Sequence, residues 1–198
     1  MKTSTKTNTM AVKTLVMCAI LTALVIILQF MGAFIKFGPF SISLVLIPIV
    51  IGAATCGVGV GAWLGLVFGF IVLASGDASA FLVINPAGAI VTVLVKGIAC
   101  GLAAGFVYKL VEKYNQYAAV AAAAIVCPLV NTGVFLLGCL LFFMDTISQW
   151  AAVAGLGGGT AHYMIFGLVG ANFLFELGTN IILSPVIVRL LNIRSKQQ

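Results

Sequence analysis

Long apolar stretches separated by short polar segments run through the whole chain. A helix that crosses a membrane needs about 20 mainly apolar residues. We expect such helices over these residues: 13–34, two shorter ones within 42–75, then 87–108, 118–143 and 163–191. The interruptions are "IKFGPFS", "SGDASAFLVINPAG", "KLVEKYNQ" and, the longest, "MDTISQWAAVAGLGGGTAH". The pattern predicts an all-α integral membrane protein with six transmembrane helices, forming one domain over residues 1–198.

Local signals define three features within this pattern. The apolar run 42–75 is too long for one span, and "TCGVGVG", residues 55–61, is the one plausible turn that would divide it into two short helices. Asn85 followed by Pro86 is typical of a helix start, with Asn as the capping residue and Pro at the first helical position. We also expect a short interfacial helix near Trp150 in the longest loop.

Glycines recur every four residues in two neighbouring predicted spans. They are Gly57, Gly61, Gly65 and Gly69 in one span, and Gly97, Gly101 and Gly105 in the next. Small residues at this spacing lie on one helical face and allow two helix backbones to approach closely. The pattern favours packing between these two helices, and a groove for a partner or ligand is the alternative.

Composition excludes a soluble protein. Apolar residues make up 63% of the chain and charged residues 7%, against about 25% charged residues in soluble domains. Mean hydropathy is +1.26. The positive charges gather near both termini and in the segment 109–113, which is typical of positive-inside topology and not of a nucleic-acid surface. We therefore expect both termini in the cytoplasm, with tails at residues 1–12 and 193–198.

The chain lacks the residues that most enzymes and cofactor proteins require. It contains one histidine, and its five cysteines show no CxxC spacing. It has no Walker A sequence, so it cannot drive transport by ATP alone. We expect no enzyme activity, no metal and no cofactor.

Three polar residues in different spans are predicted to lie at the same depth. Lys96 and Glu176 each precede a basic residue near a helix end, Lys109 and Arg189, by 13 positions. At 1.5 Å per residue this places both roughly 20 Å from the cytoplasmic end, and Asn131 falls at a similar depth. A charge at the centre of a membrane helix costs about 2.5–3.5 kcal/mol, so these residues need a reason to be there.

Several explanations fit these polar residues. Lys96 and Glu176 could neutralise each other, they could line an outward-facing cavity for a small molecule, or Lys96 could extend to the membrane surface. Asn172, Glu176 and Asn180 are spaced by four and share one helical face. Asn172 is the outer of the two amides. Asn180 lies deeper, where hydrogen bonding between helices is the more usual role.

Several motifs, in their order along the chain, resemble one membrane family. They are "AILTA" with Ala19 and Ala23, "LIPIVIGAATCGVGVGAWLGLVFG", "INPAGAIVTVLVKG", "CPLVNTGVFLLG" and "NFLFELGTNIIL". Over about residues 12–192 the chain resembles the substrate-binding S component of an energy-coupling factor (ECF) vitamin transporter. That resemblance implies six membrane helices in the plasma membrane of a prokaryote.

The resemblance also implies specific roles for residues. A vitamin-like molecule would bind near the outer face at Asn85, Lys96, Asn131, Asn172 and Glu176, with the loop around 37–40 as a lid. Ala19 and Ala23 would contact a transmembrane coupling subunit, and two cytoplasmic ATPase subunits would supply energy. Pantothenate is the first expected substrate, because Lys96 could pair with its carboxylate. Riboflavin and folate come next, although few aromatic residues in the outer loops argue against a large flat ring.

The alternative to a transporter component is a stand-alone membrane protein, either a small facilitator or an assembly factor. Such a protein would also place polar residues inside the membrane. It would not need the pair of small residues, Ala19 and Ala23, on its first helix.

Overall fold

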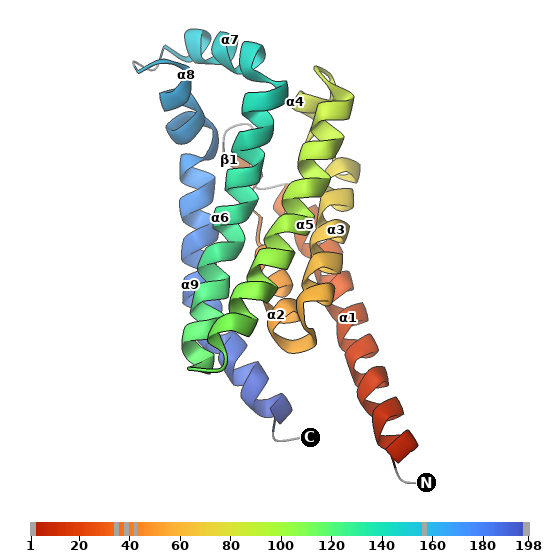
Figure 1. The fold of residues 1–198 in the computed structure, drawn as a ribbon. Coiled ribbons are helices and arrows are strands. Elements are labelled where there is room, and N and C mark those ends of the chain that lie inside the picture. Colours follow the sequence, from red (N-terminus) through yellow and green to blue (C-terminus); the bar gives the residue numbers. More distant parts are fainter. Residues whose placement is uncertain (1–2, 34–35, 38–39, 42, 156–157, 196–198) are drawn as a thin grey trace.

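The computed structural model describes residues 3–33, 36–37, 40–41, 43–155 and 158–195 as a bundle of helices with one short pair of strands (Figure 1). The elements are α1 (Thr3–Ala33), β1 (Lys36–Phe37), β2 (Phe40–Ser41), α2 (Leu46–Cys56), α3 (Val58–Ala74), α4 (Ser79–Leu82), α5 (Pro86–Val111), α6 (Gln116–Phe142), α7 (Met144–Ala154), α8 (Gly159–His162), the π-helix η1 (Tyr163–Gly170) and α9 (Ala171–Ser195). The antiparallel strand pair was not predicted.

Four helical stretches in the described part of the chain are long and apolar enough to cross a membrane. They are Val12–Ala33, Pro86–Val111, Gln116–Phe142 and Gly159–Arg189. The helices α2 and α3 are also apolar but shorter, with 11 and 17 residues, which corresponds to about 16 and 25 Å. The helical membrane-type fold is confirmed. The count of six spans remains a prediction, because α2 reaches only about half of a 30 Å hydrocarbon core.

The turn between α2 and α3 consists of a single residue, Gly57. Its φ of 96° lies in the region that glycine adopts without steric cost. Its backbone N–H donates to the Ala53 carbonyl over 3.2 Å, which closes the last turn of α2. The predicted turn within residues 55–61 is therefore confirmed, and the two helices are joined without a loop.

The glycine stripes bring α3 and α5 into direct backbone contact, and Figure 1 shows the two helices side by side. A Cβ atom on Gly65 would overlap the carbonyl oxygen of Gly97, and one on Gly101 would overlap the carbonyl oxygen of Gly61. This confirms the packing interpretation of the two stripes. It also fixes the position of α5, the helix that carries Lys96.

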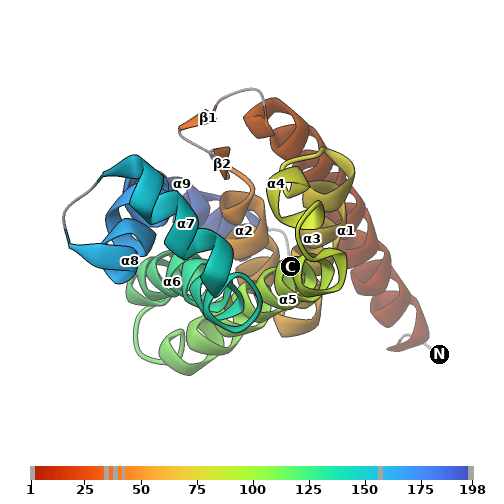
Figure 2. The same cartoon turned by 90° about the horizontal axis from the view of Figure 1, so that it is seen from above.

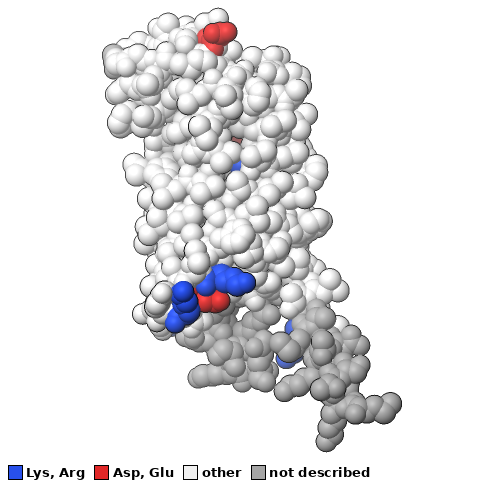
Figure 3. All heavy atoms as spheres, in the orientation of Figure 1, with Lys and Arg blue, Asp and Glu red and all other residues white. Residues whose placement is uncertain are grey.

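Both termini lie at one end of the bundle, and α4, α7 and α8 lie at the other end (Figure 1). Exposed Lys109 and Lys113 lie near the terminal end, whereas the middle of the surface in Figure 3 is almost free of charge. Viewed along the bundle, α7 crosses the end of α6 that lies away from the termini (Figure 2). This arrangement agrees with the charge pattern. That the end with both termini faces the cytoplasm remains a prediction.

Two clusters of buried apolar residues form the core. The larger cluster includes Leu46, Leu64 and Phe68, and it joins α1, α2, α3, α5, α6 and α9. The smaller cluster surrounds Phe81 and Ile147 at the end away from the termini. Members of both clusters line a single cavity between them. That cavity contains most of the polar residues that the sequence places inside the membrane.

Candidate functional site

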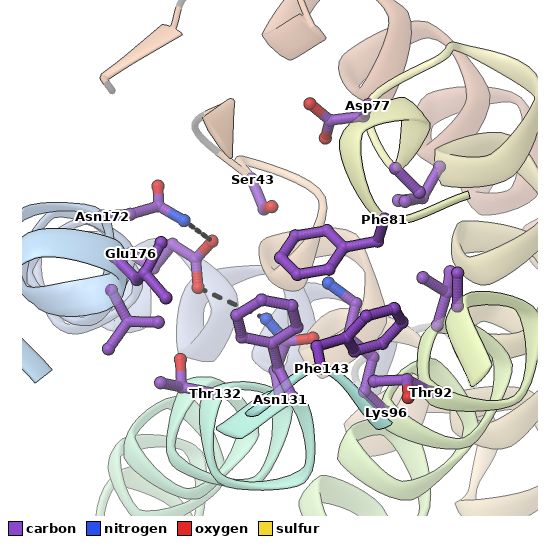
Figure 4. Close-up of a pocket in the computed structure, with 17 residues that line it drawn as sticks. Ser43, Asp77, Phe81, Thr92, Lys96, Asn131, Thr132, Phe143, Asn172 and Glu176 are labelled. Carbon is purple, nitrogen blue, oxygen red and sulfur yellow. Dashed lines mark hydrogen bonds between the residues drawn. The ribbon is translucent and has the colours of Figure 1, made fainter. Parts of the chain in front are cut away.

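A cavity of about 60 Å³ lies between α5, α6 and α9, and it reaches the segments before α2 and α4 (Figure 4). Its polar lining consists of Ser43, Asp77, Thr92, Lys96, Asn131, Thr132, Asn172 and Glu176. Its volume is small beside the roughly 300–1,000 Å³ of pockets that hold drug-sized ligands. A molecule of vitamin size therefore requires side chains to move when it binds.

Glu176 is the centre of the polar side of this cavity. Its side chain is 1% exposed. Its carboxyl group accepts a hydrogen bond from the Asn131 amide nitrogen on α6 over 3.5 Å and another from the Asn172 amide nitrogen on α9 over 3.2 Å. Ser43, just before α2, also lies beside this carboxyl group (Figure 4). Three separate chain segments thus meet at one acidic side chain.

The three polar residues that share one face of α9, Asn172, Glu176 and Asn180, have different surroundings. Asn172 and Glu176 line the cavity, whereas Asn180 does not. Asn180 is fully buried, and its amide nitrogen donates to the Glu176 backbone carbonyl over 2.8 Å. This contact supports the expectation that Asn180 has a structural role within the helix.

Lys96 lines the cavity from α5 and faces aromatic rings. Its ammonium nitrogen lies 5.4 Å from the centroid of the Phe68 ring and 5.5 Å from that of Phe135, which are distances typical of cation–π contacts. Within the described residues, no salt bridge joins Lys96 to Glu176, whose carboxyl group binds the two amides instead. The two opposite charges share a cavity without a direct ion pair.

Three polar oxygen atoms at the cavity are buried and lack a hydrogen-bond partner among the described residues. They are Asn131 Oδ1, Asn172 Oδ1 and Thr92 Oγ. A buried polar group without a partner costs about 1–3 kcal/mol. Because Glu176 engages the nitrogen atoms of both amides, their oxygen atoms remain as acceptors. A ligand with hydroxyl or N–H donors would satisfy them.

An aromatic cluster lies at the end of the cavity away from the termini. The Phe81 ring makes edge-to-face contacts with Phe143, at 4.9 Å between centroids, and with Phe135 and Trp150, each at 5.7 Å. Phe81 lies on α4, Phe135 on α6, Phe143 between α6 and α7, and Trp150 on α7. Phe81 is far from the other three in sequence, so the fold brings it to them. Sequence reasoning missed this cluster, and its presence weakens the argument against a ligand with a flat ring.

Asp77 is a second acidic residue on the cavity that the sequence did not identify as part of the site. It lies in the turn between α3 and α4. Its carboxyl group accepts a hydrogen bond over 3.2 Å from the side chain of Gln29, which is fully buried on α1. The apolar neighbourhood of Gln29 in the sequence offered a signal, since an amide within a membrane helix needs a partner.

The structure places four of the five predicted binding residues around the cavity and one elsewhere. Lys96, Asn131, Asn172 and Glu176 line it. Asn85 is not among the lining residues. Its side chain accepts a hydrogen bond from the Gly88 N–H over 3.0 Å and caps α5, which confirms the predicted helix start.

The remaining predicted functional residues are the pair on α1 and the lid. Ala19 and Ala23 are both exposed on α1. Of the predicted lid around 37–40, positions 38–39 lie outside the described residues, and the flanking residues Phe37 and Phe40 pair in the short strands.

Comparisons with known proteins agree on one family and one fold. Residues 13–188 match the family model described as "ECF transporter, substrate-specific component". The solved structure of ThiT from Listeria monocytogenes has a TM-score of 0.67 with this chain at 22% sequence identity, and the match covers 90% of this chain and 95% of ThiT. A comparison with curated proteins found no match.

Proposed function

This chain belongs to the substrate-specific components of ECF transporters, and from that membership we propose that it captures a water-soluble vitamin from outside the cell. It is a multi-pass protein of the prokaryotic plasma membrane and a transport component, not an enzyme. The cavity between α5, α6 and α9 is the proposed binding site. Lys96, Asn131, Asn172 and Glu176 are the proposed binding residues.

The observation that carries this proposal is a buried set of polar groups that the protein itself leaves incompletely paired. The Lys96 ammonium faces the Phe68 and Phe135 rings without a salt bridge to Glu176. Among the described residues, Asn131, Asn172 and Thr92 each present an oxygen atom without a hydrogen-bond partner. Keeping such groups inside a membrane protein lowers its stability. A bound small molecule that completes these interactions explains why they are there.

The polar groups favour a particular ligand chemistry. The Lys96 ammonium suits a carboxylate, and the free amide oxygens of Asn131 and Asn172 suit hydroxyl or N–H donors. Pantothenate carries a carboxylate, two hydroxyl groups and an amide N–H, so it is our first proposed substrate. Riboflavin and folate follow, and the ring cluster around Phe81 provides an aromatic wall that suits them.

Delivery of the vitamin is proposed to require an ATP-driven ECF module. The module would consist of a transmembrane coupling subunit and two cytoplasmic ATPase subunits. Support comes from family membership and from α1, where Ala19 and Ala23 are exposed and free to contact another helix. A stand-alone facilitator or assembly protein is the alternative, and it would have no use for this exposed pair.

The test is mass spectrometry of the small molecules that are released when the detergent-purified protein is denatured. A stoichiometric vitamin would establish substrate binding and identify the substrate. If no vitamin is released, the protein is then titrated with pantothenate, riboflavin and folate by calorimetry. Failure to bind a vitamin in both experiments would overturn the proposal and favour the stand-alone alternative.

A further inference from the structure

A second and larger pocket, here called the groove, lies beside the cavity between α6 and the segment formed by η1 and α9. This groove has a volume of about 620 Å³, roughly ten times that of the cavity. Its walls are α6 residues around Gly133 and residues of η1 and α9 around Val169. The exposed side chains Phe166 and Leu174 lie at its rim. Thr132 is the one lining residue with a polar side chain.

The groove and the cavity share two lining residues, Thr132 on α6 and Val169 on η1. Both side chains are short and half-buried. In Figure 4, Thr132 lies on the α6 side of the cavity, below Glu176. These two side chains therefore form a thin partition. On one side are the polar groups of the cavity, and on the other is an apolar space that opens towards the membrane.

The wall that carries Val169 borders the open groove, unlike the wall formed by α5. η1 is a π-helix. This form is rare in proteins overall, but where it occurs it is often at a functional site. The η1 residues Met164 and Leu168 are buried in the smaller apolar cluster, whereas Val169 is half-buried beside the groove. By contrast, α5 is held on α3 by direct backbone contact at Gly65 and Gly97. A change in cavity volume is therefore easiest on the η1 side.

We infer that Thr132 and Val169 form a movable partition, and that the ligand extends across it with an apolar part in the groove. This inference rests on the proposed function, since it concerns the same ligand. The polar groups of the ligand bind Lys96, Asn131 and Glu176, and its apolar part passes between the partition residues towards Gly133. The ligand class is therefore a small molecule that carries carboxylate, hydroxyl or N–H groups together with a compact alkyl or methylated group.

The glycines of the chain supply a matched pair of variants. At Gly133, a Cβ atom would have no neighbour within 4 Å, so Gly133→Leu adds a side chain that occupies space in the groove. Gly178 on α9 is equally open and lines neither the cavity nor the groove. Gly178→Leu is therefore a control for the effect of an added leucine on a membrane helix.

The experiment is calorimetric titration of pantothenate, with riboflavin and folate in parallel, into the full chain and both variants. We expect Gly133→Leu to weaken binding of the vitamin that the wild type binds by at least about tenfold, and Gly178→Leu to change it by less than about twofold. Equal affinities in wild type and Gly133→Leu would overturn the inference. Equal losses in both variants would also overturn it. If the wild type binds no vitamin, the proposed function itself fails, which is a different result.

A second variant keeps the inference testable if Gly133→Leu does not fold. Val169→Ala shortens one partition residue and adds no volume. Because the partition must move before the apolar part can pass, this variant should bind the same vitamin with an association rate at least about threefold faster, measured by stopped-flow tryptophan fluorescence. An unchanged rate would show that the partition does not limit binding, and would overturn the inference.

Discussion

The amide of Asn131 on α6 donates a hydrogen bond to the carboxyl group of Glu176 on α9 over 3.5 Å. This contact joins two helices across the side of the cavity, 45 residues apart in sequence. Asn172 donates to the same carboxyl group. Glu176 therefore fixes the orientation of two amides at once and leaves their oxygen atoms free to accept hydrogen bonds from a ligand.

Glu176→Gln is expected to weaken vitamin binding by at least tenfold, which corresponds to about 1.4 kcal/mol. A glutamine keeps the shape but offers one acceptor oxygen where two amides now donate, so at least one amide loses its orientation. Asn180→Ala should change affinity by less than about threefold, because Asn180 binds only the helix backbone. Calorimetry of both variants checks the order. The reverse order would mean that the site lies deeper than proposed.

Lys96→Met is expected to weaken binding of an anionic vitamin by at least tenfold, or about 1.4 kcal/mol. Methionine retains much of the apolar stem and removes the ammonium group that faces the Phe68 and Phe135 rings. Lys109→Met is the control, because Lys109 is exposed at the end of α5. Equal affinity of the wild type and Lys96→Met would assign Lys96 a structural role.

The hydropathy pattern predicted most of the fold because long apolar runs and their interruptions are local properties. The single-residue turn at Gly57 and the start of α5 at Asn85 and Pro86 were also visible, since both depend on backbone preferences of particular residues. Two short helices within residues 42–75 were predicted, but not that the first of them begins only at Leu46. Hydropathy measures how apolar a segment is, and it does not show where a helix begins inside an apolar run.

The site was predictable only as far as depth along a helix is predictable. Counting residues from the predicted cytoplasmic helix ends placed Lys96, Asn131 and Glu176 at one level, and all three line one cavity. Counting could not show that Lys96 and Glu176 lack a direct ion pair, because that depends on how the helices rotate and pack. The same limit hid Asp77 and the ring cluster around Phe81, whose partners lie on other elements.

Ala19→Trp and Ala23→Trp are each expected to abolish association with the coupling subunit and to leave vitamin affinity unchanged. Both alanines are exposed on α1, so a large side chain does not disturb the core, but it prevents close approach of a second helix. The measurement is co-purification of the complete ECF module with each variant, together with vitamin uptake into cells.

Leu141→Trp provides the control for these two variants. Leu141 is 75% exposed on α6, so the same large side chain is added to a different part of the surface. It should leave complex formation intact. Normal uptake in cells that carry Ala19→Trp or Ala23→Trp would contradict a coupling role for α1 and would support the stand-alone alternative.

Gly65→Ala is expected to destabilise the protein by about 1–3 kcal/mol, the usual cost of overpacking a closely packed interior. The added methyl group would overlap the Gly97 carbonyl, which is backbone and cannot rotate away, so α3 and α5 must separate. Gly59→Ala on the same helix is the control, because a Cβ atom there has no neighbour within 4 Å. Alanine is a better helix former than glycine, so this control should be as stable as the wild type or slightly more stable. Thermal unfolding in detergent measures both variants, and equal melting temperatures would contradict the direct backbone contact between α3 and α5.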